Sequence, residues 1–233
     1  MSLKEVVALI PARAGSVRVK DKNLMMLNSA TLIARKIKQL KDAGIGQVYV
    51  GSDSDLILDE AQKNGAIAIH RDPLACDESK SSANDMIRDF SQRVEGEFAI
   101  WAHCTNPFVY GNHYIEALNI FFDLAAKKKQ YDSLISVTKI QSHMWSDEKK
   151  PVNYNPWAEK HTLAKDLKPV YFQDGAIFIQ KLKDFQTNHY FFGNNPYLYE
   201  LDYLASFDIN FPEDLNLAKI LVEKMDSINQ FNL

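Results

Sequence analysis

A basic loop early in the chain carries residue types that bind phosphate groups. It runs from Ile10 to Asn23 and contains four cations, namely Arg13, Arg18, Lys20 and Lys22. The small residues Ala14, Gly15 and Ser16 allow backbone N–H groups to approach an anion, and the cations can balance a polyphosphate. The loop lacks the Gly-x-x-x-x-Gly-Lys spacing of a P-loop and the Gly-x-Gly-x-x-Gly spacing of a dinucleotide fold. It therefore predicts a phosphate site of another kind, with a solvated basic loop as the alternative.

The elements around this loop follow the pattern of a parallel sheet covered on both faces. Short β-rich runs alternate with segments of helical period in the first 140 residues, which is typical of βα units. The expected strands are 6–10, 47–51, 66–69, 98–102, 133–137 and 176–179, and the expected helices are 31–42, 55–63, 84–94, 113–126 and one that begins near Pro212. In such sheets, ligands bind beyond the carboxyl ends of the strands. The basic loop follows the first strand, so it lies where a ligand is expected.

Residues 138–170 break this pattern. Polar residues dominate there, Trp145, Tyr154 and Trp157 are scattered among them, and no period persists. A structureless insert of this length is unusual inside a compact domain, so we interpret it as a partner-binding arm or a lid. Aromatic residues in a polar stretch favour burial against another chain. We therefore predict one domain over residues 1–233, with 138–170 as an inserted dimerisation arm.

Composition excludes several classes of protein. The chain has 233 residues, of which 46% are apolar and 24% charged, as in globular proteins with a real core. The formal net charge of −3 leaves no basic surplus for nucleic acid. No apolar run approaches the roughly 18 to 20 residues of a membrane span, so we expect a cytoplasmic protein without a membrane partner or a cleaved leader. The two cysteines, Cys76 and Cys104, are expected to be free structural thiols.

Six short motifs occur in one order along most of the chain. They are Ile10-Pro-Ala-Arg13 with Ser16 and Lys22-Asn23, Val50-Gly-Ser-Asp-Ser54, Arg71-Asp-Pro-Leu-Ala75 with Asp77 and Ser81-Ser82, Cys104-Thr-Asn-Pro107, Asp174-Gly-Ala-Ile-Phe178, and Phe207-Asp-Ile-Asn210 with Glu213-Asp-Leu215. In these motifs the chain resembles the CMP-sialic acid synthetases, or acylneuraminate cytidylyltransferases, and their relatives that act on other 2-keto sugar acids. One such motif alone is weak, whereas six in the same order favour a common fold.

The resemblance implies a fold and a reaction. The fold would be an α/β, Rossmann-like nucleotide-diphosphosugar transferase fold with three layers and a mostly parallel sheet. The reaction would be attack by the anomeric hydroxyl of a nonulosonic, sialic-acid-like sugar acid on the α-phosphorus of CTP, with release of pyrophosphate. The implied partners are CTP, a small acidic sugar, Mg²⁺ and a second copy of the chain in a homodimer.

The resemblance implies one group of residues that binds the triphosphate and another that binds the metal. Arg13 and Lys22 would neutralise the triphosphate, with the backbone of residues 14–16 as the cradle. Asp208 and Asn210 stand where the family has two aspartates that hold a divalent metal. Asparagine can ligate through its carbonyl oxygen but attracts Mg²⁺ less strongly than a carboxylate. Asp208 is otherwise a turn former or a helix N-terminal acid.

The base pocket is assigned to three further residues. Asn23, Arg71 and Ser82 match family positions near the base. Cytosine offers O2 and N3 as acceptors and its amine as a donor, so these residue types are chemically suitable. The alternatives are that Arg71 is a surface arginine and that Ser82 caps the helix that follows it. Asp53, on the loop after the second strand, is expected to be a turn or cap residue.

The sugar-acid pocket is where the chain departs most from the family. His103 stands where the family has glutamine, and Phe178 stands where it has tyrosine. Phe191 and Phe192 fall where the family has an aromatic pair beside the acyl group of the sugar. A single histidine at a strand end is otherwise a structural hydrogen bonder, and adjacent phenylalanines are otherwise core residues.

These departures leave two other functions open. Val17 replaces a lysine of the family motif, and together with His103 and Asn210 it suggests a related nucleotidyltransferase with another nucleotide or with a sugar-phosphate acceptor. Asn210 alone suggests a catalytically weakened homologue that binds nucleotide. Pyrophosphate release with each nucleoside triphosphate and a panel of acid sugars separates these hypotheses.

Overall fold

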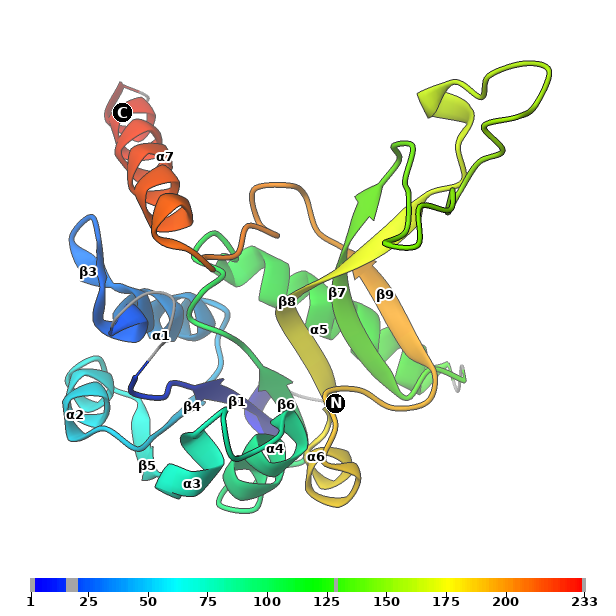
Figure 1. Cartoon of the computed structure of the whole chain (residues 1–233). Coiled ribbons are helices and arrows are strands. Elements are labelled where there is room, and N and C mark those ends of the chain that lie inside the picture. The colour runs from blue at the N-terminus through cyan, green and yellow to red at the C-terminus, as the bar shows by residue number, and fades with distance from the viewer. Residues whose placement is uncertain (1–2, 16–20, 128–129, 232–233) are drawn as a thin grey trace.

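The central feature of the fold is a seven-stranded sheet (Figure 1). The computed structural model describes residues 3–15, 21–127 and 130–231, and within them the strand order is β5-β4-β1-β6-β8-β7-β9. The strands are β1 Val6–Pro11, β4 Gln47–Ser52, β5 Ile67–His70, β6 Phe98–Trp101, β7 Ser133–Ile140, β8 Val170–Lys181 and β9 Pro196–Glu200. Strand β8 is antiparallel to β6 and β7, and the other neighbours are parallel. The predicted mostly parallel sheet is confirmed.

Helices cover both faces of this sheet. The helices are α1 Leu32–Asp42, α2 Asp55–Lys63, α3 Pro73–Cys76, α4 Ala83–Ser91, α5 Gly111–Ala126, α6 Leu182–Asn188 and α7 Pro212–Phe231. Shorter elements are the hairpin of β2 Met26–Leu27 and β3 Ala30–Thr31 and the 3-10 helices η1 Leu3–Glu5, η2 Lys22–Leu24 and η3 Ala164–Asp166. The buried side chains of α1, α2, α5 and α7 pack on one face, and those of α4 and α6 pack on the other. The three predicted layers are therefore present.

Strand β1 shows why the sequence forms this arrangement. Val6, Ala8 and Ile10 belong to the core on the α1 and α5 side. Val7 and Leu9 belong to the core on the α4 and α6 side, because successive strand residues point to opposite faces. A strand buried on both faces needs a continuous apolar run, which is what the sequence has at this position.

Local sequence sets where the helices begin. Helix α1 follows Thr31, whose Oγ1 accepts a hydrogen bond from the Ala34 N–H at 3.1 Å. Helix α4 follows Ser82, which forms a capping box with Asp85. The helices predicted at 31–42, 55–63, 84–94 and 113–126 correspond to α1, α2, α4 and α5. Those predictions are confirmed to within a few residues.

The segment 138–170, called the arm below, is not structureless at its two ends, so that part of the prediction is wrong. Thr138 and Ile140 lie in β7 and pair with Phe172 and Val170 of β8. Between these strands the arm contains a bridge from Trp145 to Pro151 and the helix η3. Figure 1 shows the arm projecting from the body of the sheet. The sequence did not predict this pairing of β7 with β8, because each paired segment is short and its partner lies about thirty residues away along the chain.

Two expectations from composition have structural counterparts. Cys76 and Cys104 are free and buried, as predicted. Burial raises the pKa of the Cys76 thiol to about 11, which keeps it in the unreactive thiol form at neutral pH. Of the helices described, none combines the length and the apolar character that a membrane crossing requires.

Candidate active site

A cavity of about 370 Å³ lies at the carboxyl ends of the parallel strands. Six of the residues predicted for the site line it, namely Arg13, Lys22, Asn23, Arg71, Ser82 and His103. They come from the loop after β1, the segment after β5 and the loop after β6. This is the edge of the sheet where an open α/β fold binds its ligands. The predicted Ser16 lies outside the described residues, as do Val17, Arg18 and Lys20.

The phosphate-binding candidates of the first loop are held by carboxylates. Arg13 forms a two-point ion pair with Glu78, with Nη2 and Oε2 2.6 Å apart and Nε and Oε1 2.9 Å apart. The N–H of Ala14 donates to Asp53 Oδ1 at 2.8 Å. Asp53 therefore bonds the basic loop after β1 and is not simply a turn residue. The Arg13 guanidinium and the Ala14 N–H thus both face carboxylate oxygens of the protein, and donors of this kind also suit phosphate oxygens.

Lys22 and Asn23 connect this loop to its surroundings. The ammonium of Lys22 donates to the carbonyl of Ile209 at 2.7 Å. Asn23 is buried and donates through Nδ2 to the carbonyl of Arg13 at 3.1 Å. The cation of Lys22 therefore lies beside the loop that carries Asp208, and Asn23 fixes the backbone at Arg13.

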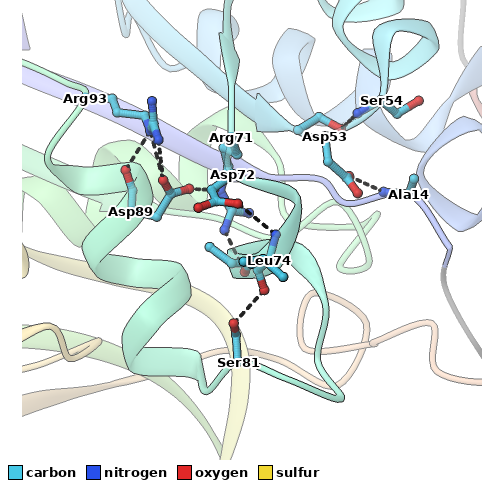
Figure 2. Close-up of polar contacts among 11 residues, drawn as sticks. Ala14, Asp53, Ser54, Arg71, Asp72, Leu74, Ser81, Asp89 and Arg93 are labelled. Atoms are coloured by element: carbon cyan, nitrogen blue, oxygen red, sulfur yellow. Dashed lines mark hydrogen bonds and ion pairs between the residues drawn. The ribbon is translucent and has the colours of Figure 1, made fainter.

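The wall formed after β5 contains Arg71 and Ser82. The side chain of Arg71 is 1% exposed, so the alternative of a surface arginine is wrong. Its Nε donates to Asp89 Oδ2 at 3.1 Å (Figure 2). Its Nη2 donates to the Ala75 carbonyl at 3.2 Å. Ser82 Oγ accepts from the Asp85 N–H at 3.2 Å, which confirms the helix-cap alternative, yet Ser82 also lines the cavity.

His103 is a hydrogen-bonded part of the cavity wall. Its Nδ1 donates to the Gly175 carbonyl at 2.8 Å, and its Nε2 accepts from the Trp101 indole N–H at 3.2 Å. These partners require the neutral ring, because the carbonyl only accepts and the indole only donates. Burial lowers the pKa of His103, which favours the same neutral form. Both nitrogens are engaged, so His103 acts as a structural hydrogen bonder in this geometry.

The predicted sugar-pocket phenylalanines lie behind this wall. Phe178 and Phe191 stack with ring centroids 4.8 Å apart, and both rings contact His103 edge-on. Phe191 also packs against Trp101. Phe192 lines a separate hollow beside Tyr190. None of the three lines the cavity as the described residues form it, so Phe178 and Phe191 support the wall from the core side.

Asp208 and Asn210 lie together on the loop before α7. Asn210 Nδ2 donates to Asp208 Oδ2 at 2.7 Å, whereas Asp208 Oδ1 is buried and has no hydrogen-bond partner among the described residues. A buried carboxylate oxygen without a donor fits a cation, and Mg²⁺ prefers one or two carboxylates together with water and phosphate oxygens. No group of three or more His, Cys, Asp or Glu side chains arranged for a metal occurs in the described part of the chain. The residues present therefore fit a Mg²⁺ only if most of its ligands come from water or from a bound phosphate group.

The family follows from the sequence as a whole. A sequence model of the family described as Cytidylyltransferase matches residues 7–232. The chain belongs to the cytidylyltransferase family. The resemblance carried by the six motifs is thereby confirmed at the level of the family.

Curated cytidylyltransferases show how far the similarity extends. N-acylneuraminate cytidylyltransferase of Streptococcus agalactiae serotype V is 26% identical over 218 residues, which cover 89% of this chain and 51% of that protein. 3-deoxy-manno-octulosonate cytidylyltransferase of Elusimicrobium minutum is 26% identical over 226 residues, which cover 96% of this chain and 84% of that protein. The chain thus spans about half the length of the N-acylneuraminate relative.

A solved structure confirms the predicted fold. The structure of CMP:2-keto-3-deoxy-manno-octonic acid synthetase, complexed with CTP, matches with a TM-score of 0.68 over 95% of this chain and 99% of that one. Sequence identity in this match is 15%, so the likeness is one of fold. The three-layer nucleotidyltransferase architecture is therefore shared with a cytidylyltransferase.

Helix α1 of this cytidylyltransferase-family chain holds the loop after β6, which sequence reasoning missed. Arg35 Nε and Gln39 Nε2 donate to the Pro107 carbonyl at 2.9 and 2.7 Å. The buried ammonium of Lys36 donates to the Asn106 carbonyl at 2.8 Å. Lys36 falls between Ile33 and Leu40 on the apolar face of α1, and this position could have indicated a buried role. These donors fix the loop that follows His103.

Asn106 and Asp174 link the loop after β6, strand β8 and the loop before α7, a role that the sequence did not predict although both residues stand in the six motifs. Asn106 is fully buried, and its Nδ2 lies 3.4 Å from the carbonyls of both Asp174 and Phe207. The Asp174 carboxylate accepts from the Ser136 hydroxyl and from the Ala176 N–H, and burial raises its pKa. The motifs mark both positions, but nothing local in the sequence indicates the bridging role, because the hydrogen-bond partners are distant along the chain.

Lys36 should make stability depend on pH. Burial lowers its pKa to about 7, whereas an unfolded lysine titrates near 10.5. Between these values the unfolded chain binds a proton that the folded chain lacks, so stability rises with pH in that window. We expect the unfolding free energy to rise by about 2 kcal/mol more between pH 7 and pH 9 in the wild type than in Lys36→Met. Urea denaturation at both pH values measures this, and equal pH dependence would place the ammonium in contact with solvent.

Proposed function

We propose that this chain transfers the cytidylyl group of CTP to a nonulosonic, sialic-acid-like sugar acid and releases pyrophosphate. The observation that carries the proposal is the meeting of Arg13, Lys22 and Arg71 in one cavity, although the first two follow β1 and the third follows β5. Two of these cations suit a triphosphate and the third suits the acceptor atoms of a pyrimidine. A volume of about 370 Å³ is of the size that small-molecule sites have.

In the proposed reaction the protein positions groups and balances charge. The anomeric hydroxyl attacks the α-phosphorus and gives up its proton to water, the bond from that phosphorus to the bridging oxygen breaks, and pyrophosphate leaves. Arg13 and Lys22 neutralise the charge that develops on the phosphates, and Arg13 exchanges Glu78 for a phosphate oxygen. Asp208 and Asn210 would hold the Mg²⁺, which supplies further neutralisation when bound.

His103 and its neighbours contribute to the acceptor side. The neutral ring bonds Trp101 and Gly175, and the Phe178 and Phe191 rings back it, so that this wall keeps its shape when the substrate binds. The sialic-acid-like acceptor is proposed because the six motifs resemble those of the CMP-sialic acid synthetases and because one relative is an N-acylneuraminate cytidylyltransferase. A 3-deoxy-octulosonic acid is the competing acceptor, since another relative is named for it.

The test is pyrophosphate release with defined substrates. The chain is incubated with Mg²⁺, one of the four nucleoside triphosphates, and N-acetylneuraminic acid, 3-deoxy-manno-octulosonic acid or a sugar phosphate. We expect release with CTP and N-acetylneuraminic acid. Release only with another nucleotide or with a sugar phosphate contradicts the proposal. Nucleotide binding without release from any pair would instead identify a nucleotide-binding homologue.

We further propose that the chain forms a homodimer through the arm. Trp157 is 78% exposed and Trp145 is 51% exposed in a segment that projects from the body (Figure 1). Aromatic side chains are the commonest hot spots of interfaces, so Trp157→Ala should weaken dimerisation by about 2 kcal/mol, or about thirtyfold in Kd. Tyr203→Ala, which removes an equally exposed ring outside the arm, is the control. Sedimentation over a dilution series measures both, and a monomeric wild type at high concentration would rule the interface out.

A further inference from the structure

Arg71 is enclosed by the protein in a way that fixes its direction. The residue is buried, although arginine is almost never fully buried without a partner. The ring of Phe90 lies against the guanidinium, with 5.7 Å between its centroid and Cζ. The Ala75 carbonyl accepts one N–H of Nη2, and Asp89 accepts the N–H of Nε. The guanidinium has five N–H donors, and the described residues accept hydrogen bonds from two of them. Arg71 also lines the cavity, so the other three donors can bond a ligand there.

Strand β4 leaves the space that this side chain needs. A Cβ at Gly51 would lie 2.5 Å from Arg71 Cδ and 2.8 Å from the nearest carbon of the Phe90 ring. Contacts this close do not occur, so glycine is the residue that lets the stem of Arg71 pass between β4 and α4. The position of the side chain is therefore set by the strand as well as by its polar partners.

Asp89 provides the only charged partner of Arg71 among the described residues, and it is itself held from the other side. Arg93 donates from Nε and Nη2 to Asp89 Oδ1 at 2.9 and 2.6 Å, while Asp89 Oδ2 faces Arg71 (Figure 2). The Asp89 side chain is 11% exposed and that of Arg93 is 44% exposed. Asp89 lies in the last turn of α4 and Arg93 lies two residues beyond its end, and neither is part of the cavity lining as the described residues form it.

We propose that Asp89, oriented by Arg93, is a positioning residue that directs the Arg71 guanidinium at O2 and N3 of a cytosine base. The inference rests on the proposed function, in which Arg71 meets the base. Uracil carries a proton on N3, so a donor directed there accepts cytosine and rejects uracil. Base selection would then depend on two residues outside the cavity. Without this orientation of the Arg71 guanidinium, the preference for cytosine would fall while the triphosphate contacts stay intact.

The test compares the affinities of CTP and UTP in the presence of Mg²⁺ and without an acceptor. These nucleotides share the ribose and triphosphate, so a general structural loss weakens both equally. We expect Asp89→Asn to weaken CTP about tenfold, equivalent to about 1.4 kcal/mol, with UTP unchanged, and Arg93→Gln to have a smaller effect of the same sign. The matched control is Arg88→Gln, because Arg88 pairs with Asp85 on the same helix, at 2.8 Å, and makes no hydrogen bond or ion pair with Arg71 or Asp89 among the described residues.

A second pair of variants tests whether Asp89 acts through Arg71. In an Arg71→Lys background the planar, two-edged donor is gone, so adding Asp89→Asn should change CTP affinity less than twofold. A full tenfold loss in that background overturns the proposal, and so does equal weakening of CTP and UTP in the single variant. A wild type that prefers CTP, with the preference unchanged in Asp89→Asn, contradicts this inference alone. A wild type without that preference contradicts the proposed function and this inference together.

Discussion

Replacing Arg13 with alanine should lower kcat/KM for CTP by at least about a hundredfold while leaving the fold almost unchanged. A preorganised donor at a transferring phosphate accounts for losses of this size. The structural cost is small because Arg13 pairs with Glu78, whose side chain is 73% exposed, and exposed pairs contribute about 0 to 1 kcal/mol. Lys22→Ala should have an effect of the same order on turnover. Pyrophosphate release gives the rates, and thermal unfolding checks the fold.

Glu78→Gln is the matched variant for this prediction. It removes the carboxylate that holds Arg13 without changing Arg13 itself, so phosphate oxygens no longer compete with a charged partner. We expect CTP to bind a few times more tightly, an effect opposite in sign to that of Arg13→Ala. Near-normal rates for both Arg13→Ala and Lys22→Ala would remove the loop from the active site.

The placement of the side chains that line the cavity was predictable because parallel strands end at one edge of the sheet. The periods of β1 and β6 and the motif after β5 put Arg13, His103 and Arg71 at that edge, and the structure brings all three to one cavity. Their partners were not predictable. Glu78 and Asp89 lie on surface-like polar stretches, and nothing local separates a carboxylate that faces an arginine from one that faces water. The contacts arise from tertiary packing, which a linear pattern does not record.

The residues predicted for the sugar-acid pocket show a different reason why sequence alone does not place a side chain. Phe178 was predicted to contact substrate, yet it packs in the core against Phe191. Which face of β8 a residue occupies depends on its register with β7, and that ladder shifts between Ile135 and Val137. A shift of one residue exchanges the two faces of a strand. The period along β8 is therefore not enough to assign Phe178 to pocket or core.

The metal pair gives the prediction with the largest effect. Asp208→Ala should abolish Mg²⁺-dependent pyrophosphate release at any practical Mg²⁺ concentration, because it removes the only carboxylate of the pair. Asp208 Oδ1 is the buried oxygen that the described residues leave without a donor, and it is the atom best suited to a cation. Asp208→Asn keeps the size of the side chain and removes only its charge, so it should fail in the same way. Metal titrations of pyrophosphate release measure both variants.

Asn210→Asp should have the opposite effect on the metal requirement. Asn210 donates to Asp208 at 2.7 Å, so aspartate there puts two negative charges in contact. Without a metal these charges repel and should lower the unfolding temperature, whereas Mg²⁺ should restore it, because a cation binds two carboxylates more strongly than one. The Mg²⁺ concentration for half-maximal activity should then fall about tenfold. If Asp208→Ala keeps wild-type activity and metal dependence, and Mg²⁺ does not stabilise Asn210→Asp, the two residues only shape the loop before α7 and the nucleotide alone carries the metal.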